Sequence, residues 1–537
     1  MDRVGDRLLS ITRQHPVAAV IVLTLAMHLP WIFGSPLAAT EPHRALPAHQ
    51  MAEGGRAVSW QVVTLFGQVY HRKPPMHIWQ LAAAESVLGA SEWVWRLPSV
   101  LWTAAAGAFV VWFARRHGSG EAGAWAVVLF AMLMPLWNPA RQADIDASNN
   151  AAGVIFALIG LHLGLSSTRS WWPWVIALAL AAVTASLIKG PAYLPLAGGT
   201  AIALLLTRQR LAATIAISAI GLGLFVLWAW WTSAQREIAT LNLSGGTSGA
   251  SEAAANLLPE SAQDVIEALL LPVMLLALAV PTTLALVTLH RVDFTRRARP
   301  INLVLLATIS AIVIAILFSM AQPRYTYMLL PMLAVAGAMA LARGRLLIGT
   351  RFATVAAFCL PLATFALGLR ELGGAVDLIV TVAATLLAVV IARKLIHHLA
   401  LPTKTARPAI YAAILLLLPS LTSGLSHQRE RQAKSALGGS LQLAAAAAHR
   451  PVITGRLLFA HPELFHYGEL NVDYRGEARL RANRIRPGEL VAIFEDDRDR
   501  FDDHDFDLLL EARVRTEEQR KFLLLQRKRA DEPPAKR

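Results

Sequence analysis

Long apolar stretches without Asp, Glu, Lys or Arg recur through most of this chain of 537 residues. A helix that crosses a bilayer needs roughly 20 mostly apolar residues, and about 13 stretches meet that criterion. They begin near Pro16, Leu97, Gly123, Asn149, Ser170, Gly190, Leu211, Ala268, Pro300, Tyr325, Phe352, Leu378 and Pro408. The first run is long and is not followed by a convincing small-residue cleavage site, so we expect a first span and no cleaved signal peptide. The pattern predicts a mainly α, polytopic transmembrane protein.

The pattern changes after the last of these stretches. The remaining apolar runs are short and are separated by charged turns, which is typical of strands; they are Pro451–Ala460, Glu489–Phe494, Phe506–Leu510 and Phe522–Leu525. A helix is expected around Ser435–His449. We therefore predict a transmembrane domain over residues 1–426 and a small α+β extramembrane domain over residues 427–537. No solenoid-type internal repeat stands out.

Composition supports a membrane protein over a soluble one. The chain is 55% hydrophobic and only 16% charged, whereas a soluble domain carries about 25% charged residues. The same balance excludes disorder, which needs low hydrophobicity and a high density of charge. Cys359 is the one cysteine, so an intramolecular disulfide framework and a Cys-rich metal site are excluded.

The net charge of +14 suggests nucleic acid at first sight, but its distribution gives another explanation. Basic residues gather in alternate loops, as they do on the cytoplasmic side of membrane proteins; these loops hold Arg115, Arg116, Arg169, Arg208, Arg210, Arg291, Arg296, Arg297, Arg299, Arg343, Arg345, Arg351, Arg393, Lys394, Lys404 and Arg407. We expect a multi-pass protein of the plasma (inner) membrane with a cytoplasmic N-terminus, an extracytoplasmic C-terminal domain and no nucleic-acid partner.

The first outer loop, about residues 36–96, is too long for a plain connector. Long ordered loops are usually functional. Pro74–Leu88 is mostly apolar but too short to span, so it is expected to form an interfacial or re-entrant helix. Polar residues cluster at residues 40–44, which include Glu41, His43 and Arg44, and at residues 70–73, which include Tyr70 and Lys73. The plainer alternative is that these residues are interfacial anchors.

Other ionisable residues stand at the predicted outer ends of spans. They are Arg141, Asp144, Asp146, Lys189 and Arg324, with Tyr325 beside the last. Each one alone is more often a snorkelling side chain than a ligand. Together they place cations and acids on one side of the bilayer, where cations favour a phosphate and a carboxylate can deprotonate an acceptor. No P-loop or dinucleotide fingerprint is present, so a cytosolic nucleotide donor is not supported.

Several short motifs follow one another in a set order along the chain. They are Thr40-Glu41-Pro42-His43-Arg44 followed by Met51, Lys73-Pro74-Pro75 with Trp79, Arg96-Leu97-Pro98-Ser99, the stretch Arg141 to Asp146, Lys189-Gly190-Pro191, and Arg324-Tyr325 with Leu330-Pro331. Their order and spacing resemble the ArnT-like and protein O-mannosyltransferase-like glycosyltransferases of the GT-C class. The resemblance is best from about residue 40 to residue 327.

The resemblance implies an enzyme that moves a hexosyl or pentosyl group from a polyprenyl-phosphate donor to a lipid, glycan or protein acceptor, with inversion. Glu41 would be the acceptor base, with Asp144 or Asp146 orienting the acceptor or supporting the base. The implied substrate-binding residues are His43, Arg44, Tyr70, Lys73, Arg141, Lys189, Arg324 and Tyr325.

Two positions depart from the family pattern. Thr40 stands where members carry the first acid of an Asp-Glu pair, and Arg72 stands where many carry an acid before Lys-Pro-Pro. Arg72 argues against a bound metal. A divalent ion stays one alternative, since Glu41, Asp144 and Asp146 offer the oxygen ligands that hard cations prefer.

Two other classes compete with the enzyme. A transporter or flippase of a lipid-linked sugar would carry charges near the bilayer midplane and often inverted repeats, whereas here the charges gather at outer ends. A scaffold protein would leave the Lys-Pro-Pro and Asp-rich turns without a role.

Overall fold

The computed structural model describes residues 14–38, 40–54, 63–65, 68–70, 73–166, 171–207, 300–317, 326–343, 437–448, 450–454, 463–466, 472–474, 480–501, 504–513 and 521–528, with a few isolated positions besides. The predicted spans that begin near Leu211, Ala268, Phe352, Leu378 and Pro408 lie outside these residues, as do Arg324 and Tyr325. The described part separates into two compact units.

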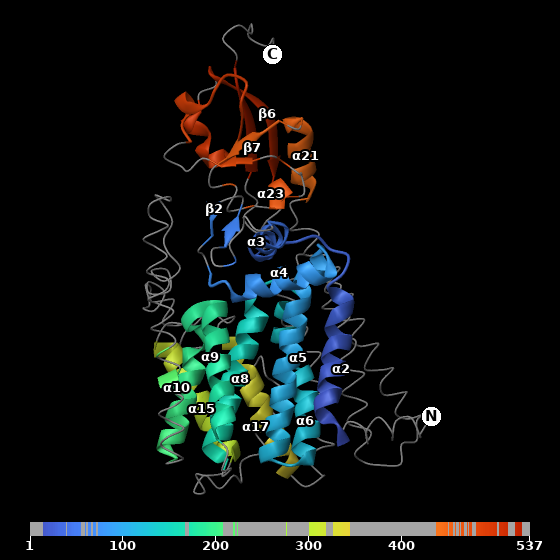
Figure 1. Ribbon diagram of the computed structural model, residues 1–537, viewed down its shortest axis with the longest axis vertical. Coiled ribbons are helices and arrows are strands. Elements are labelled where there is room, and N and C mark those ends of the chain that lie inside the picture. The colour runs from blue at the N-terminus through green and yellow to red at the C-terminus, as the bar shows by residue number, and fades with distance from the viewer. Residues whose placement is uncertain are drawn as a thin grey trace, which may run out of the picture. The chain divides into compact units, whose positions relative to one another are not determined.

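The first unit is a bundle of apolar helices (Figure 1). Its helices are α2 (Pro16–His28), α5 (Glu92–His117, of which the first turn belongs to the second unit), α6 (Gly120–Ala131), α7 (Trp137–Ala140), α8 (Ile145–Leu165), α9 (Trp172–Lys189), α10 (Leu194–Leu206), α15 (Pro300–Leu317) and α17 (Leu330–Arg343). Short 3-10 turns are η1 (Leu29–Trp31), η3 (Met134–Leu136), η4 (Gly190–Tyr193) and η6 (Tyr327–Leu329).

Several of these helices meet the requirements of a membrane span. Within the described residues, four stretches are long and apolar enough to cross a bilayer: Glu92–His117, Ile145–Leu165, Trp172–Leu206 and Pro300–Leu317. Pro16–Trp31, Gly120–Ala131 and Tyr327–Ala342 are shorter apolar helices. These findings confirm a mainly helical membrane protein, while the total of about 13 spans stays a prediction.

Helix α8 lies at the centre of the first unit. Nearly all of its residues are buried, because it packs against α9 and α10. Helix α10 in turn packs closely on α15, where a Cβ at Gly199 would meet the backbone oxygen of Ala307 at 2.3 Å. Small residues allow such close approaches between membrane helices.

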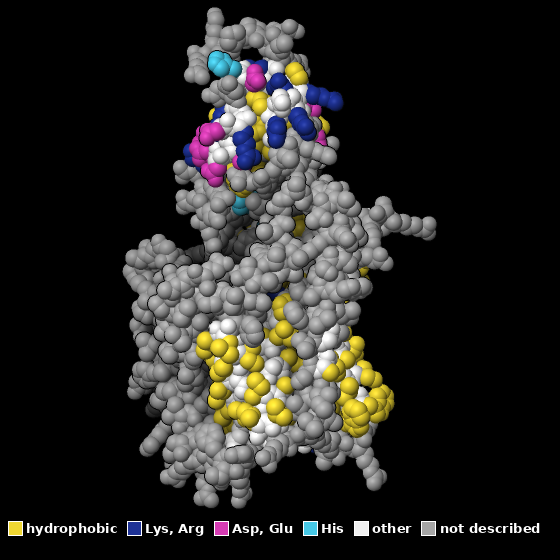
Figure 2. Space-filling view, turned by 90° about the vertical axis from the view of Figure 1, so that its left-hand side faces the viewer, with side chains coloured by type: hydrophobic (Ala, Val, Ile, Leu, Met, Phe, Trp, Pro, Cys, Tyr) yellow, Lys and Arg dark blue, Asp and Glu magenta, His cyan; other side chains and the backbone are white. Residues whose placement is uncertain are grey.

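Many exposed side chains on the described helices of this unit are apolar. Figure 2 shows hydrophobic side chains gathered over the helices; exposed examples are Ile176, Leu180, Leu205, Leu206, Ile309, Val313 and Leu317 on α9, α10 and α15. An exposed apolar belt on helices of this length fits contact with lipid.

The second unit contains residues 32–96, which include the first outer loop expected at about residues 36–96, together with the C-terminal region. The loop forms α3 (Pro42–Glu53), a hairpin of β1 (Thr64–Leu65) and β2 (Gln68–Val69), α4 (Met76–Leu88) and the first turn of α5. Pro42 occupies the first turn of α3, where a proline's fixed φ suits a helix start. Helix α4 is the short helix expected over Pro74–Leu88, and it ends at Gly89 with φ of 84°, a conformation that suits glycine.

The C-terminal region folds around a five-stranded sheet in the order β4-β3-β5-β7-β6. The strands are β3 (Val452–Thr454), β4 (Val472–Tyr474), β5 (Leu490–Phe494), β6 (Phe506–Arg513) and β7 (Lys521–Arg527), with helices α21 (Leu437–Ala447) and α23 (Glu463–His466) and turns η7 (Ala482–Arg484) and η8 (Glu495–Arg500). Strand β3 runs parallel to β4 and β5, and β7 runs antiparallel to β5 and β6.

Alternate residues of β5 and β7 enter two different hydrophobic clusters. Leu490 and Ala492 pack with Leu443 of α21, whereas Val491 and Ile493 pack with Ile485 and Phe501. The sheet is therefore covered on both faces. The α+β character expected of this region is confirmed, although the compact-unit division groups residues 32–96 with it and not with the helical bundle.

Candidate active site

Glu41 lies in a buried ion pair with Arg96. Its side chain is 1% exposed and that of Arg96 is fully buried. Nε of Arg96 donates to Oε1 of Glu41 at 2.7 Å, and Nη2 donates to Oε2 at 2.9 Å. The backbone N–H of Ala38 also donates to Oε2, at 3.1 Å. A two-pronged contact of this kind holds the start of α3 to the first turn of α5.

The remaining donors of Arg96 are satisfied by the backbone of the same loop. Nη1 donates to the carbonyl oxygens of Ile32 and Ser35, and Nη2 donates to that of Pro36. Since all five guanidinium N–H groups have partners, the pair fastens the loop's first turns in place. The geometry favours an architectural role for Glu41 over the acceptor base implied by the motif.

Arg44 and Tyr70 form a second buried contact in this unit. Nη1 of Arg44 donates to the Tyr70 hydroxyl at 2.5 Å and to the backbone oxygen of His43 at 3.2 Å. Both side chains are at most 6% exposed, and they tie α3 to the end of β2. Lys73 is half-buried directly before the Pro74-Pro75 pair that precedes α4.

In the helical unit, the acidic turn before α8 is brought to the end of α9. Asp144 is the N-cap of α8, and its Oδ1 accepts from the backbone N–H of Ile145 at 2.7 Å. Nζ of Lys189 donates to Oδ1 of Asp146 in a contact whose side chains are only 7% and 17% exposed. The structure thus joins a predicted cation and a predicted acid that lie 43 residues apart in sequence.

Arg141 lies in a different environment. It is fully buried, its guanidinium carbon is 5.7 Å from the ring centre of Trp31 and 5.9 Å from that of Trp137, and Nη2 donates to the backbone oxygen of Met27. Cation–π contacts on two rings hold it within the helix packing. This position favours a structural role over binding of the donor phosphate.

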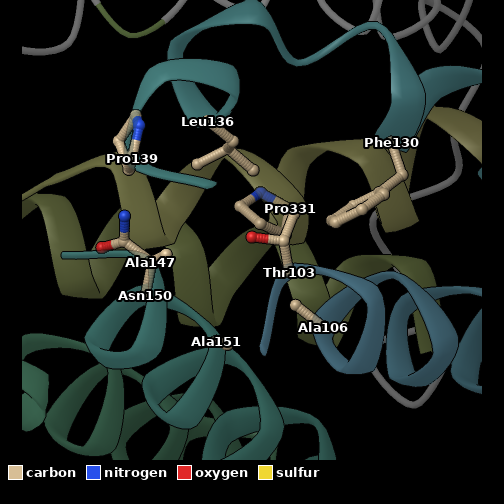
Figure 3. A pocket seen from close by; sticks show the side chains of 9 residues that line it. All are labelled: Thr103, Ala106, Phe130, Leu136, Pro139, Ala147, Asn150, Ala151 and Pro331. Carbon is tan, nitrogen blue, oxygen red and sulfur yellow. The ribbon is translucent and has the colours of Figure 1, made fainter. Parts of the chain in front are cut away.

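A cavity lies between helices of the same unit (Figure 3). Its lining is mostly apolar and consists of Thr103, Ala106, Phe130, Leu136, Pro139, Ala147, Asn150, Ala151 and Pro331. Asn150 is 4% exposed, and neither polar atom of its amide has a hydrogen-bond partner among the described residues. A buried amide without partners is costly, so this wall of the cavity suits a small polar group or an ordered water.

Sequence reasoning missed a cluster around His49 in the second unit. Nδ1 of His49 lies 2.6 Å from Oε1 of Glu85, and Nε2 lies 3.4 Å from Glu53. The other oxygen of Glu85 accepts from the Trp95 indole at 2.7 Å. The hydrogen bond to Glu85 raises the pKa of His49 above its usual range. The one signal in the sequence is the spacing of His49 and Glu53 by one helical turn.

His466 of α23 completes this cluster. Its ring centre lies 5.5 Å from that of His49 and 6.3 Å from that of Trp95, edge to face in both cases. Burial, and next the neighbouring His49, lowers the pKa of His466. The cluster therefore joins the first outer loop to the C-terminal region.

The described residues do not fit a metal site. None of them form a group of three or more His, Cys, Asp or Glu side chains that could hold an ion. Of the three oxygen donors considered from the sequence, Glu41 is engaged by Arg96 and Asp146 by Lys189, while Asp144 caps the start of α8.

Comparison with known proteins shows which of them this chain resembles. Residues 72–231 match the family model described as dolichyl-phosphate-mannose-protein mannosyltransferase. No curated protein matched the chain in sequence.

The crystal structure of ArnT from Cupriavidus metallidurans in the apo state has a TM-score of 0.68 and 16% identity, over 95% of this chain and 97% of that chain. The structure of ArnT from the same organism bound to undecaprenyl phosphate has a TM-score of 0.68 and 17% identity, over 96% and 98%. The chain is therefore a polytopic helical membrane protein with a GT-C fold, and the expected resemblance to the ArnT-like proteins is confirmed at the level of the fold.

Proposed function

We propose that this protein is an integral-membrane glycosyltransferase that transfers one sugar from a polyprenyl-phosphate donor to an acceptor at the outer face of the membrane. The fold similarity to ArnT over nearly the whole chain, including the form bound to undecaprenyl phosphate, supports this class of donor. The observation that carries the proposal is the pair of Asp146 and Lys189, since it joins a carboxylate and a cation that the reaction requires.

In the proposed reaction the acceptor oxygen or nitrogen attacks the anomeric carbon. The bond from that carbon to the phosphate oxygen breaks, and the polyprenyl phosphate leaves with the electron pair. The acceptor proton passes to a carboxylate, for which we choose Asp146 over Glu41. Both oxygens of Glu41 are held by the buried guanidinium of Arg96, whereas Lys189 contacts Asp146 at Oδ1. In-line displacement inverts the anomeric configuration.

The cations have the complementary role. The donor is a phosphodiester, and its phosphate gains a second negative charge as it leaves. Lys189 is our candidate to stabilise that charge, with Arg324 as a further one. Interactions that strengthen as charge develops are the ones that accelerate a reaction. The acceptor is a lipid, a glycan or a protein.

The test supplies a panel of radiolabelled polyprenyl-phosphate sugars to membranes that contain the full chain, and follows label into endogenous acceptors. Asp146→Asn should lower transfer by roughly 10²- to 10⁴-fold, the usual contribution of a general base. Glu121→Gln, which changes an exposed acid at the start of α6, is the matched control and should transfer normally. A wild-type protein that transfers no sugar but moves lipid-linked sugar across the membrane would establish the transporter instead.

A further inference from the structure

The contact between Asp146 and Lys189 has a consequence for the order of events in the proposed reaction. Each side chain neutralises the other, and both are largely shielded from solvent. In this state the carboxylate oxygen Oδ1 is occupied by the ammonium, which stands where the proton of an acceptor would have to arrive. The ammonium is likewise engaged and not free to bind a phosphate.

A donor phosphate competes with Asp146 for the same ammonium. We propose that donor binding draws Lys189 from the Asp146 carboxylate to the phosphate, and that this exchange frees Asp146 to accept the proton of the acceptor. Lys189 then couples the two substrates: the donor binds first and the base becomes available second. This inference rests on the proposed function, since it takes the polyprenyl phosphate as its ligand.

The local structure allows the exchange. Lys189 is the last residue of α9 and Gly190 follows with φ of 61°, so the lysine stem leaves the helix at a sharp turn and its four-carbon chain can reorient. Asp146 lies in the first turn of α8, where the helix N-terminus favours a negative charge. The carboxylate therefore retains favourable electrostatics after the ammonium departs.

The same exchange has a use beyond binding order. If the Asp146 carboxylate becomes available only after the donor has bound, proton transfer is confined to the complex in which the sugar can be transferred. As the sugar leaves, the added charge on the phosphate strengthens its hold on Lys189. Asp146 is then kept free until the product lipid dissociates.

The experiment measures binding of farnesyl phosphate to the purified full-length protein in detergent, with farnesol as the probe that lacks the phosphate. Asp146→Asn should tighten farnesyl phosphate binding by roughly three- to tenfold, because the competing carboxylate is gone. Lys189→Met should weaken binding. In the double variant the tightening should disappear, so that it binds like Lys189→Met alone. Farnesol binding should be the same in all variants.

Glu121→Gln is the matched control for charge. It removes one negative charge from an exposed acid of the same helical unit, so it measures the long-range effect of charge on an anion and should change affinity much less than Asp146→Asn. Lys189→Arg should retain phosphate binding, which separates the role of the cation from a general loss of folding.

The outcomes separate the inference from the function on which it rests. If the wild-type protein binds farnesyl phosphate no better than farnesol, the proposed donor class is wrong. If it prefers the phosphate but Asp146→Asn fails to tighten binding, or still tightens it when Lys189 is replaced by Met, then the exchange is wrong and the transferase proposal stands.

Discussion

Single side chains in this protein carry large electrostatic consequences because they are buried. Arg96 has every guanidinium N–H paired, with Glu41 and with three backbone carbonyls. A lysine offers three donors from one point and cannot reproduce that fork. Removal of one member of a buried ion pair leaves the other charge without compensation, which costs about 3–5 kcal/mol.

We therefore expect Arg96→Met to lower the thermal stability of the protein strongly, by a free energy of about 3–5 kcal/mol. The double variant Arg96→Met/Glu41→Gln should lose less than Arg96→Met alone, since it leaves no buried charge unpaired. Thermal unfolding in detergent, followed by tryptophan fluorescence, measures both. Equal losses in the single and double variants would contradict the architectural role of the pair.

At the scale of elements, helix α23 meets helix α3 through the cluster of His49, Trp95 and His466. The two histidines have opposite pKa shifts, upward for His49 and downward for His466. The raised pKa of His49 contributes stability that is fully present below pH 6.5 and is lost as the pH rises through the raised value. The lowered pKa of His466 contributes stability that is lost as the pH falls below 6.5. In the unfolded state the exposed His466 ring takes up a proton in this range, whereas the buried ring of the folded state stays neutral to lower pH.

The contact between α23 and α3 should consequently be most stable between pH 6.5 and the raised pKa of His49. Hydrogen exchange of residues 463–466 as a function of pH measures it, and their protection relative to the intrinsic exchange rate at each pH should fall on acidification. His466→Phe keeps a ring in the stack without a titrating group, so the acidic loss should vanish.

His461 provides the matched control for that experiment. Its ring packs edge to face on Phe494 with centres 5.8 Å apart, away from His49. The acidic loss should persist in His461→Phe. If His466→Phe retained the full acidic loss, the dependence on pH would have to arise from another group.

At the scale of the whole molecule, the spans were the most predictable feature. The length and hydrophobicity of an apolar run are enough to predict a helix. The runs near Pro16 and Pro300 correspond to helices that begin at those residues. The run near Leu97 is a helix that begins at Glu92, and the run near Asn149 is one that begins at Ile145. The polar residues in those first turns interrupt the apolar pattern but not the helix, because Glu92 and Asp146 suit a helix N-terminus.

The site was harder to predict because its contacts join distant positions. Hydrophobicity places Glu41, Asp146 and several cations at outer ends of spans but does not select partners among them. The pairs are set by tertiary packing, across 55 residues for Glu41 and Arg96 and 43 for Asp146 and Lys189. The burial of Arg141 against two tryptophan rings could not be predicted from the sequence for the same reason.

The predicted orientation can be tested with cysteines on the two sides of α5, in a Cys359→Ser background. This helix of 26 residues is about 39 Å long, enough to cross the hydrocarbon core. Ala90 and Glu121 are exposed just before and after it. Ala90→Cys should react with an impermeant maleimide in intact cells, whereas Glu121→Cys should react only after permeabilisation. The reverse pattern would invert the topology.

The pairing of Glu41 with Arg96 also bears on how the protein is made. Synthesis runs from the N-terminus, so Glu41 leaves the ribosome 55 residues before its partner exists. During that interval the carboxylate is best kept in water, and the first loop has no reason to settle on its final path. When the next helix follows, its Arg96 guanidinium can donate both to Glu41 and to the backbone carbonyls of the loop. Completion of the outer loop is thereby timed by insertion of the helix that follows it.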